Sequence, residues 1–190
     1  TALQAGLIDE RIFVALLVMA LATTMSSGPL LQALFGRRAP RRVGNFLARG
    51  GFVPRLQARD RKQATEELCR ALADDEGLPF LEARDAVWAR ERVAPTGVGQ
   101  GIAVPHGRLA SLVSPCVALG FSEEGIDFDA PDGKPAQIVF LVLTPREDDG
   151  AQLELLADVG RTLARPETRR RLLAARGYTE VLAVLRMEWV

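Results

Sequence analysis

The strongest constraint on the fold is an uncharged segment near the beginning of the chain. No Asp, Glu, Lys or Arg occurs in the 25 residues from Ile12 to Gly36, and the first half of this run is almost wholly apolar. At about 1.5 Å per residue, a helix of this length crosses a bilayer. The alternatives are a buried core helix and a signal peptide, but a signal peptide needs a basic segment where Asp9, Glu10 and Arg11 stand. We therefore predict a transmembrane helix segment over residues 1–36.

A basic segment follows the apolar run. Residues 37–50 contain five arginines, together with one proline and two glycines. Arginine beside a membrane helix is typical of the cytoplasmic side. We therefore predict a linker at 37–50 and a cytoplasmic domain at 51–190, attached to the inner (plasma) membrane.

The predicted domain alternates between helices and strands. The apolar run IVFLVL within residues 137–143 is typical of a strand covered on both faces, and Asp132-Gly133 predicts a turn before it. The predicted strands are 52–56, 102–104, 116–121 and 137–143, and the predicted helices lie at 60–77, 79–95, from 151 onward, 167–175 and 179–185. This order predicts an α/β fold with a mixed central sheet flanked by helices, preceded by one transmembrane helix.

Composition argues against several classes of function. The chain holds 24 basic and 24 acidic residues, so charge gives no argument for a nucleic-acid partner. Cys69 and Cys116 are too far apart for a redox Cys-x-x-Cys motif or a metal-ligand pair, and only one histidine is present. We therefore predict no metal site.

The candidate chemistry lies in the stretch TGVGQGIAVPHGRL. Three alternating glycines lead through a short apolar strand to Pro105 and to His106, the only histidine. Glycine lets backbone amides approach a phosphoryl group, and a neutral imidazole has a lone pair that can attack phosphorus. The spacing fits neither the dinucleotide fingerprint nor a P-loop. The pattern alone therefore leaves both a nucleophilic and a structural role open for His106.

The same stretch closely resembles the active-site signature of phosphotransferase-system enzyme IIA domains of the fructose/mannitol and nitrogen-regulatory type. The similar sequence extends over about residues 50–188 and includes Ala-Arg-Glu-Arg before the glycines and GIDFDAPDGKP after them. The resemblance implies that His106 accepts a phosphoryl group from the phosphocarrier protein of that system, with Arg90 neutralising charge and with no cofactor. The site residues that it implies are His106, Arg90 and Gln152, with Thr96, Gly97, Gly99 and Gly101 binding phosphate.

One position departs from the family pattern. Many members have a second histidine at the start of the helix after the apolar strand, where this chain has Gln152. Glutamine keeps a hydrogen-bond donor but carries no charge. Helical spacing puts Gln152 on the face of Leu156 and Val159, which favours a position in the site, and an ordinary residue of the first helical turn is the alternative. Whether the domain is an active phosphoryl carrier therefore stays open.

The apolar segment has a resemblance of its own. GLIDERIFVALLVMALATTMSSGPLL resembles the last transmembrane helix of monovalent cation:proton antiporters, whose other transmembrane helices would then be partners. Together the two resemblances predict the C-terminal part of an antiporter with an enzyme IIA-like regulatory domain. The alternatives are a non-catalytic ligand-sensing or partner-binding module on a membrane transporter, part of a sugar phosphotransferase permease, and an inert tail.

Overall fold

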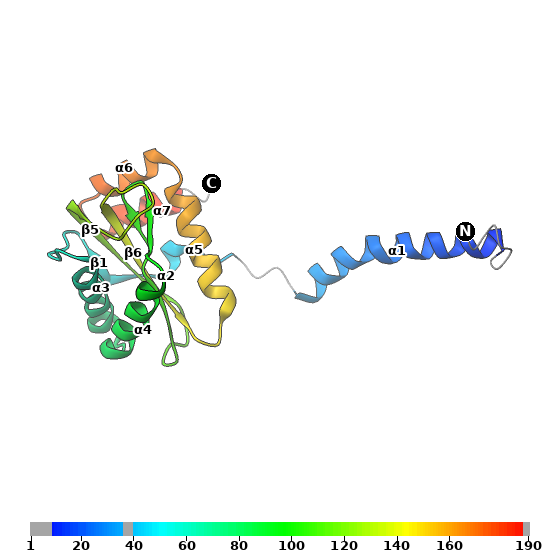
Figure 1. Ribbon diagram of the computed structural model, residues 1–190, viewed down its shortest axis with the longest axis horizontal. Helices are drawn as coiled ribbons and strands as arrows, with labels where there is room; N and C mark the ends of the chain where they lie inside the picture. Colours follow the sequence, from blue (N-terminus) through cyan, green and yellow to red (C-terminus); the bar gives the residue numbers. More distant parts are fainter. Residues whose placement is uncertain (1–8, 36–39, 188–190) are drawn as a thin grey trace. The chain divides into compact units, whose positions relative to one another are not determined.

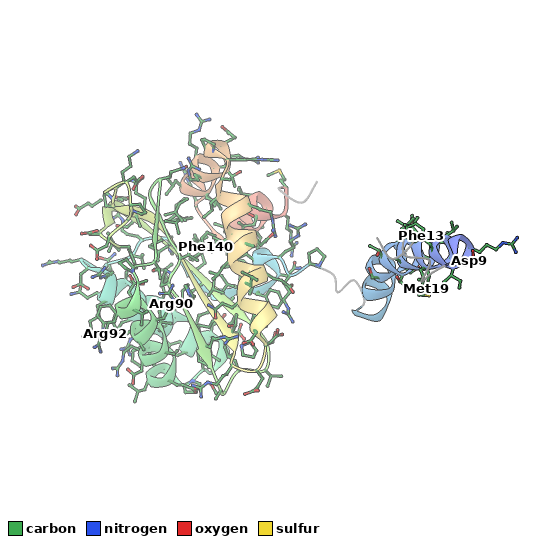
Figure 2. All side chains as sticks on the ribbon, turned by 45° about the vertical axis from the view of Figure 1, so that its right-hand side comes forward. Asp9, Phe13, Met19, Arg90, Arg92 and Phe140 are labelled. Atoms are coloured by element: carbon green, nitrogen blue, oxygen red, sulfur yellow. The ribbon has the colours of Figure 1, made fainter. Side chains whose placement is uncertain are left out.

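The computed structural model describes residues 9–35 and 40–187, and the chain divides into two units between Pro40 and Arg41. The first unit contains α1 (Glu10–Phe35), whose apolar side chains, such as Phe13 and Met19, project into solvent (Figure 2). Its window Arg11–Gly28 has a mean hydropathy of 1.6 and is the one stretch of the described chain that is long and apolar enough to cross a membrane. Its location in a membrane stays a prediction.

The second unit has three layers, with helices on both faces of a sheet (Figure 1). Its helices are α2 (Val43–Phe46), α3 (Arg61–Glu76), α4 (Phe80–Val93), α5 (Asp149–Leu163), α6 (Pro166–Ala174) and α7 (Tyr178–Met187). Its strands are β1 (Leu47–Val53), β2 (Gly97–Gly99), β3 (Ile102–Ala103), β4 (His106–Leu109), β5 (Cys116–Ile126) and β6 (Ala136–Pro145). The predicted mixed α/β fold is confirmed.

The sheet is mixed, with β1, β5, β6, β3 and β2 in that order and β4 also paired with β6. The pairs β1–β5, β3–β6 and β4–β6 are parallel, and β5–β6 and β2–β3 are antiparallel. Strands β3 and β4 pair one after the other with the same edge of β6, so the short connection between them also runs along this edge. That connection contains Val104 and Pro105, immediately before His106.

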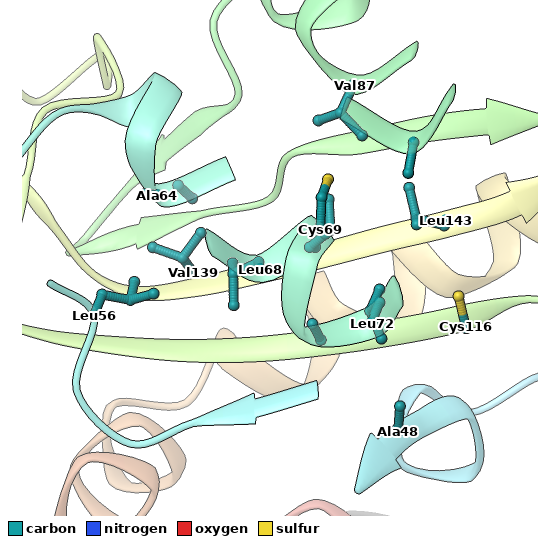
Figure 3. Close-up of a cluster of buried hydrophobic side chains, with 14 of the residues drawn as sticks. Ala48, Leu56, Ala64, Leu68, Cys69, Leu72, Val87, Cys116, Val139 and Leu143 are labelled. Atoms are coloured by element: carbon teal, nitrogen blue, oxygen red, sulfur yellow. The ribbon is translucent and has the colours of Figure 1, made fainter. Parts of the chain in front are cut away.

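The central strand β6 is buried on both faces, as its apolar run predicted. Val139, Leu141 and Leu143 pack under α3 and α4, whereas Phe140 and its even-numbered neighbours pack under α5, α6 and α7 (Figure 2). Figure 3 shows the first of these clusters, in which Cys69 lies among aliphatic side chains. Burial raises the pKa of both Cys69 and Cys116 to about 12, so these thiols stay protonated and pack as core residues.

Local signals placed most helices correctly. Asp60 caps α3 by accepting a hydrogen bond from the Gln63 amide at 2.8 Å, and Gly77 ends the helix with a φ of 67°. These are the cap residues that a helix start and stop favour. The predicted turn at Asp132-Gly133 is also present, with the Gly133 amide bonded to the Ala130 carbonyl at 2.9 Å.

The beginning of the folded unit differs from the prediction. The first strand covers 47–53 instead of 52–56, and the unit starts at Arg41, inside the predicted linker. Val43, Leu47 and Ala48 are buried, and β1 pairs with β5. The arginine and the two glycines of LARGGFV conceal the strand in the sequence, and its partner, β5, lies about seventy residues later.

Candidate functional site

His106 is positioned by the register of β4 on β6. It pairs with Val142, and its side chain is 8% exposed. Side chains alternate along a strand, so His106 and Arg108 project to the face of α5, whereas Gly107 and Leu109 face α3 and α4. Gly107 lets β4 approach α4 closely, since a Cβ there would lie 2.9 Å from a methyl group of Val87.

The His106 ring has a defined orientation. Its Nδ1 lies 2.9 Å from the carbonyl oxygen of Val104, and because a carbonyl can only accept, Nδ1 carries the hydrogen. The lone pair of the neutral ring is then on Nε2. Burial is the main cause that lowers the pKa of His106 below 6.5; the Arg90 charge adds to it, against the raising effects of the Val104 hydrogen bond and the Glu91 charge. His106 is therefore a neutral nucleophile near neutral pH.

The lowered pKa of His106 predicts how stability depends on pH. Below pH 6.5 His106 is protonated in the unfolded chain, whereas it stays neutral in the folded chain until the pH reaches its lower folded pKa. The free energy of unfolding therefore falls as the pH drops from 6.5 toward the folded pKa, and it is fully retained above pH 6.5. Urea unfolding at about pH 7.5 and about pH 5.5 should show this loss in the wild type, and His106→Gln should lose less. An equal loss in both proteins would contradict the prediction.

Three arginines surround one side of His106. The cavity there, of about 380 Å³, is lined by Ala86, Arg90, His106, Gly107, Arg108, Arg146 and Gln152, and we call it the arginine cavity. None of these lining residues is acidic. Guanidinium groups match the geometry of phosphoryl oxygens, so this cavity suits a phosphoryl group beside the imidazole.

A second cavity, of about 400 Å³, also adjoins His106, and we call it the apolar cavity. Arg90 and His106 line both cavities. Ile102, Val104 and Leu156 are among the side chains that make the rest of its wall mostly aliphatic. Such a surface suits an apolar contact with a partner rather than a charged group.

The glycine segment forms a hairpin, and its donors differ from the prediction. The Gly97 amide bonds to the Phe128 carbonyl at 3.2 Å, and a Cβ at Gly97 would lie 2.6 Å from that same oxygen. The Gln100 amide bonds to Asp132 at 2.7 Å. Gly99 lines the apolar cavity, whereas Gly97 and Gly101 line neither cavity. Gly97 is therefore needed for the hairpin itself, and phosphate binding by Gly97 and Gly101 stays a prediction.

Thr96 is also held internally, by a buried acid that the sequence did not single out. Its amide and its hydroxyl both donate to the Glu91 carboxylate, at 3.2 and 2.5 Å. Glu91 is 3% exposed, and Arg61 lies 4.0 Å from it while also pairing with Asp129. Both donors of Thr96 are thus used within the fold, and its role as a phosphate ligand stays a prediction.

The structure brings His106, Arg90 and Gln152 together at the arginine cavity, as predicted from the sequence. Arg90 also donates to the Ala94 carbonyl at 2.8 Å, which fixes it at the end of α4 (labelled in Figure 2). Arg108 and Arg146 were missed. If β4 had been predicted as a strand, the alternation of side chains would have placed Arg108 on the same face as His106. The position of Arg146 near His106 follows only from the pairing of β4 with β6.

No group of three or more His, Cys, Asp or Glu side chains in residues 9–35 and 40–187 is arranged to hold a metal ion. The donors at His106 are guanidinium and amide groups, which bind anions.

Comparison with known proteins agrees with this geometry. The model of the family described as phosphoenolpyruvate-dependent sugar phosphotransferase system, EIIA 2, matches residues 46–187. The fructose-specific EIIABC component of Bacillus subtilis is 30% identical over 76% of this chain, and the chain spans only 23% of that protein's length. A nitrogen regulatory protein of Bradyrhizobium diazoefficiens is 30% identical over 75% of this chain and 94% of its own.

Solved structures show the same fold. The crystal structure of nitrogen regulatory protein IIA-Ntr from Neisseria meningitidis has a TM-score of 0.70 and 31% identity, covering 75% of this chain and 98% of that one. The IIA mannitol structure from Escherichia coli has a TM-score of 0.61 at 22% identity, covering 72% and 96%, and this match concerns the fold alone.

Proposed function

The chain belongs to the phosphoenolpyruvate-dependent sugar phosphotransferase system EIIA 2 family, and from this premise we propose that Nε2 of His106 accepts a phosphoryl group. The observation that carries the proposal is the pairing of an oriented, neutral imidazole with the arginine cavity. The nucleophile and the cationic groups line the same cavity, so the charge of an incoming phosphoryl group is balanced where it arrives.

The proposed step is a direct displacement at phosphorus. The donor is a phosphohistidine on a phosphocarrier protein of the phosphotransferase system. The Nε2 lone pair of His106 forms the new P–N bond while the donor's P–N bond breaks, and its electron pair returns to the donor's imidazole. The hydrogen stays on Nδ1, which donates it to the Val104 carbonyl, so the product is a phosphohistidine that can pass the group on by the reverse step.

The apolar cavity is the proposed contact surface for such a carrier. Its aliphatic wall adjoins the imidazole, so a partner that covers it would also exclude water from the reacting atoms. A protein of this fold has been solved with a partner, as the complex of enzyme IIAMTL and phosphorylated enzyme IIBMTL from Escherichia coli, which matches this chain with a TM-score of 0.61.

The proposal extends to the apolar helix. We propose that α1 crosses the inner (plasma) membrane, that the folded unit lies in the cytoplasm, and that the unit regulates a monovalent cation:proton antiporter through the remaining transmembrane helices. The exposed apolar surface of α1 and the basic residues after it support this part. Upstream coding sequence with further hydrophobic spans and buried acidic residues would support an antiporter, whereas sugar-permease segments would replace it.

Phosphorylation is tested on the purified chain in detergent with phosphoenolpyruvate and the phosphocarrier system. We expect about one acid-labile phosphate per wild-type chain and none in His106→Ala, because no other histidine can take it. Arg84→Gln, which removes an arginine outside both cavities, is the matched control and should label normally. Equal labelling of His106→Ala would refute the proposal.

Gln152 favours a second candidate, a module that senses an anionic ligand without transferring phosphate. It lies at the arginine cavity where many family members have a second histidine, and it supplies no positive charge. This candidate predicts no labelling of the wild type, together with a rise in melting temperature when the ligand is added. Restored labelling in Gln152→His would identify position 152 as the cause.

A further inference from the structure

The arginine cavity contains a guanidinium whose bonding is incomplete. Arg108 pairs with Asp149 through Nη2, while its Nε is buried and has no hydrogen-bond partner among the described residues. A buried donor without a partner is costly, so in a native protein it needs an explanation, such as a catalytic role or a bound water or ion. Arg108 stands two residues after His106, on the same side of β4.

A second unpartnered polar atom lies on β6 directly opposite Arg108. Thr144 is the register partner of Arg108 on β6, and its hydroxyl is buried without a hydrogen-bond partner in the described chain. Like Val142, which packs under α5, it faces the side of His106. Two adjacent strands therefore carry unsatisfied polar groups at paired positions, and one of these groups, Arg108, lines the arginine cavity.

Asp149, which pairs with Arg108, competes only weakly with a phosphoryl group for this guanidinium. The Asp149 side chain is 88% exposed, so water screens its attraction to Arg108. A phosphoryl group on His106 carries more charge and offers several acceptor oxygens to Arg108 and Arg146 within the cavity. The exchange of Asp149 for phosphoryl oxygens is therefore favourable for Arg108.

We propose that the arginine cavity is an oxyanion site in which Arg108 leaves Asp149 and, together with Arg146, binds the oxygens of the phosphoryl group on His106. This rests on the proposed function and adds to it the residues that hold the product. Asp149 is the first residue of α5, and Gln152 in the same turn lines the cavity. The exchange therefore changes the contacts of the first turn of α5 with each phosphorylation of His106.

The same turn also contacts the start of the folded unit. Asp148 caps α5 by accepting from the Ala151 amide at 3.0 Å, and Arg41 pairs with Asp148 at 2.6 Å. The release of Asp149 thus occurs beside the ion pair that holds Arg41. Hydrogen exchange at the Ala151 amide reports on this turn.

Inorganic phosphate tests the site without any transfer step. Because the chain has a single histidine, labelled His106 gives one set of ring signals in the full chain in detergent, and its shift during a phosphate titration measures binding. We expect wild-type binding that Arg108→Gln weakens on the order of tenfold, as charged hydrogen bonds are lost, and that Asp149→Asn strengthens. The double variant should bind like Arg108→Gln, because Asp149 acts only through Arg108.

The matched control is Arg84→Gln, since Arg84 also pairs with a neighbouring acid, Asp85, at a similar exposure of 34%. It should bind phosphate like the wild type. Absence of binding to the wild type, or unchanged binding in Arg108→Gln, would overturn the inference. A wild type that binds phosphate through Arg108 but takes no label from the phosphocarrier would instead contradict the proposed function alone.

After phosphorylation, two further readouts apply. The phosphohistidine of Arg108→Gln should hydrolyse several-fold faster than that of the wild type, and exchange at the Ala151 amide should rise on phosphorylation of the wild type but not of Arg108→Gln. Phosphorylated wild type and Arg108→Gln with equal hydrolysis rates would refute the role of Arg108 while leaving His106 as the acceptor.

Discussion

A chain shortened to residues 51–190 should fail to fold, whereas residues 41–190 should unfold cooperatively. The shorter chain loses α2 and the first half of β1, including buried Val43, Leu47 and Ala48. Burial of each Val or Leu contributes about 1.5–3 kcal/mol, and the lost strand also leaves part of β5 unpaired. Their sum approaches the 5–15 kcal/mol that is typical of a whole domain, at roughly 0.1 kcal/mol per residue.

Circular dichroism and urea titration of the two fragments provide the measurement. We expect a sigmoidal transition for 41–190 and no transition, or insoluble protein, for 51–190. A fragment starting at 47 is a useful intermediate, because it keeps β1 but lacks Val43 and the two arginines before it. Similar midpoints for 41–190 and 51–190 would show that β1 and α2 contribute little to the fold.

Replacement of Asp158 by alanine should destabilise the 41–190 fragment by about 3 kcal/mol. This carboxylate is 1% exposed and accepts hydrogen bonds from the Val43 amide and from Arg42, each at 2.8 Å. Arg161 approaches it at 3.4 Å. Its removal leaves a buried backbone N–H and a partly buried guanidinium without their acceptor, and it opens a space under α5.

Glu154→Ala is the control on the same helix. Glu154 is 42% exposed, lies 4.0 Å from the Arg41 guanidinium and accepts a long hydrogen bond of 3.4 Å from the Arg41 amide, so its loss should change the free energy of unfolding by less than about 1 kcal/mol. Asp158→Asn, which keeps the shape and an acceptor oxygen, should fall between the two. If Asp158→Ala and Glu154→Ala are equally stable in urea, the buried ion pair does not hold the start of the unit to α5.

These contacts bear on the regulation of a transporter that we propose above. The segment after the apolar helix enters the folded unit at Arg41 and Arg42, and both arginines pair with acids of α5 or of its cap. The same helix presents Gln152 to the arginine cavity, and its first residue pairs with Arg108. A change at His106 therefore has a short route, through one helix, to the residues that follow the proposed membrane segment.

What the sequence determined by itself was local. The caps Asp60 and Gly77, the apolar run of β6 and the order of helices and strands depend on neighbours within a few residues, so the three-layer fold could be predicted. His106 was identified from its motif, and Arg90 and Gln152 from the resemblance to a family. Each of these signals is complete within one short stretch of chain.

Only the tertiary structure decided the rest, because it depends on which distant segments meet. The pairing of β1 with β5 moved the start of the domain, and the pairing of β4 with β6 brought Arg108 and Arg146 to His106. The hydrogen bonds of Thr96 to Glu91 and of Gly97 to Phe128 give internal partners to the donors of two predicted phosphate ligands. A hydrogen-bond donor can serve a ligand only if the fold has not already given it a partner, and no sequence pattern records that partner.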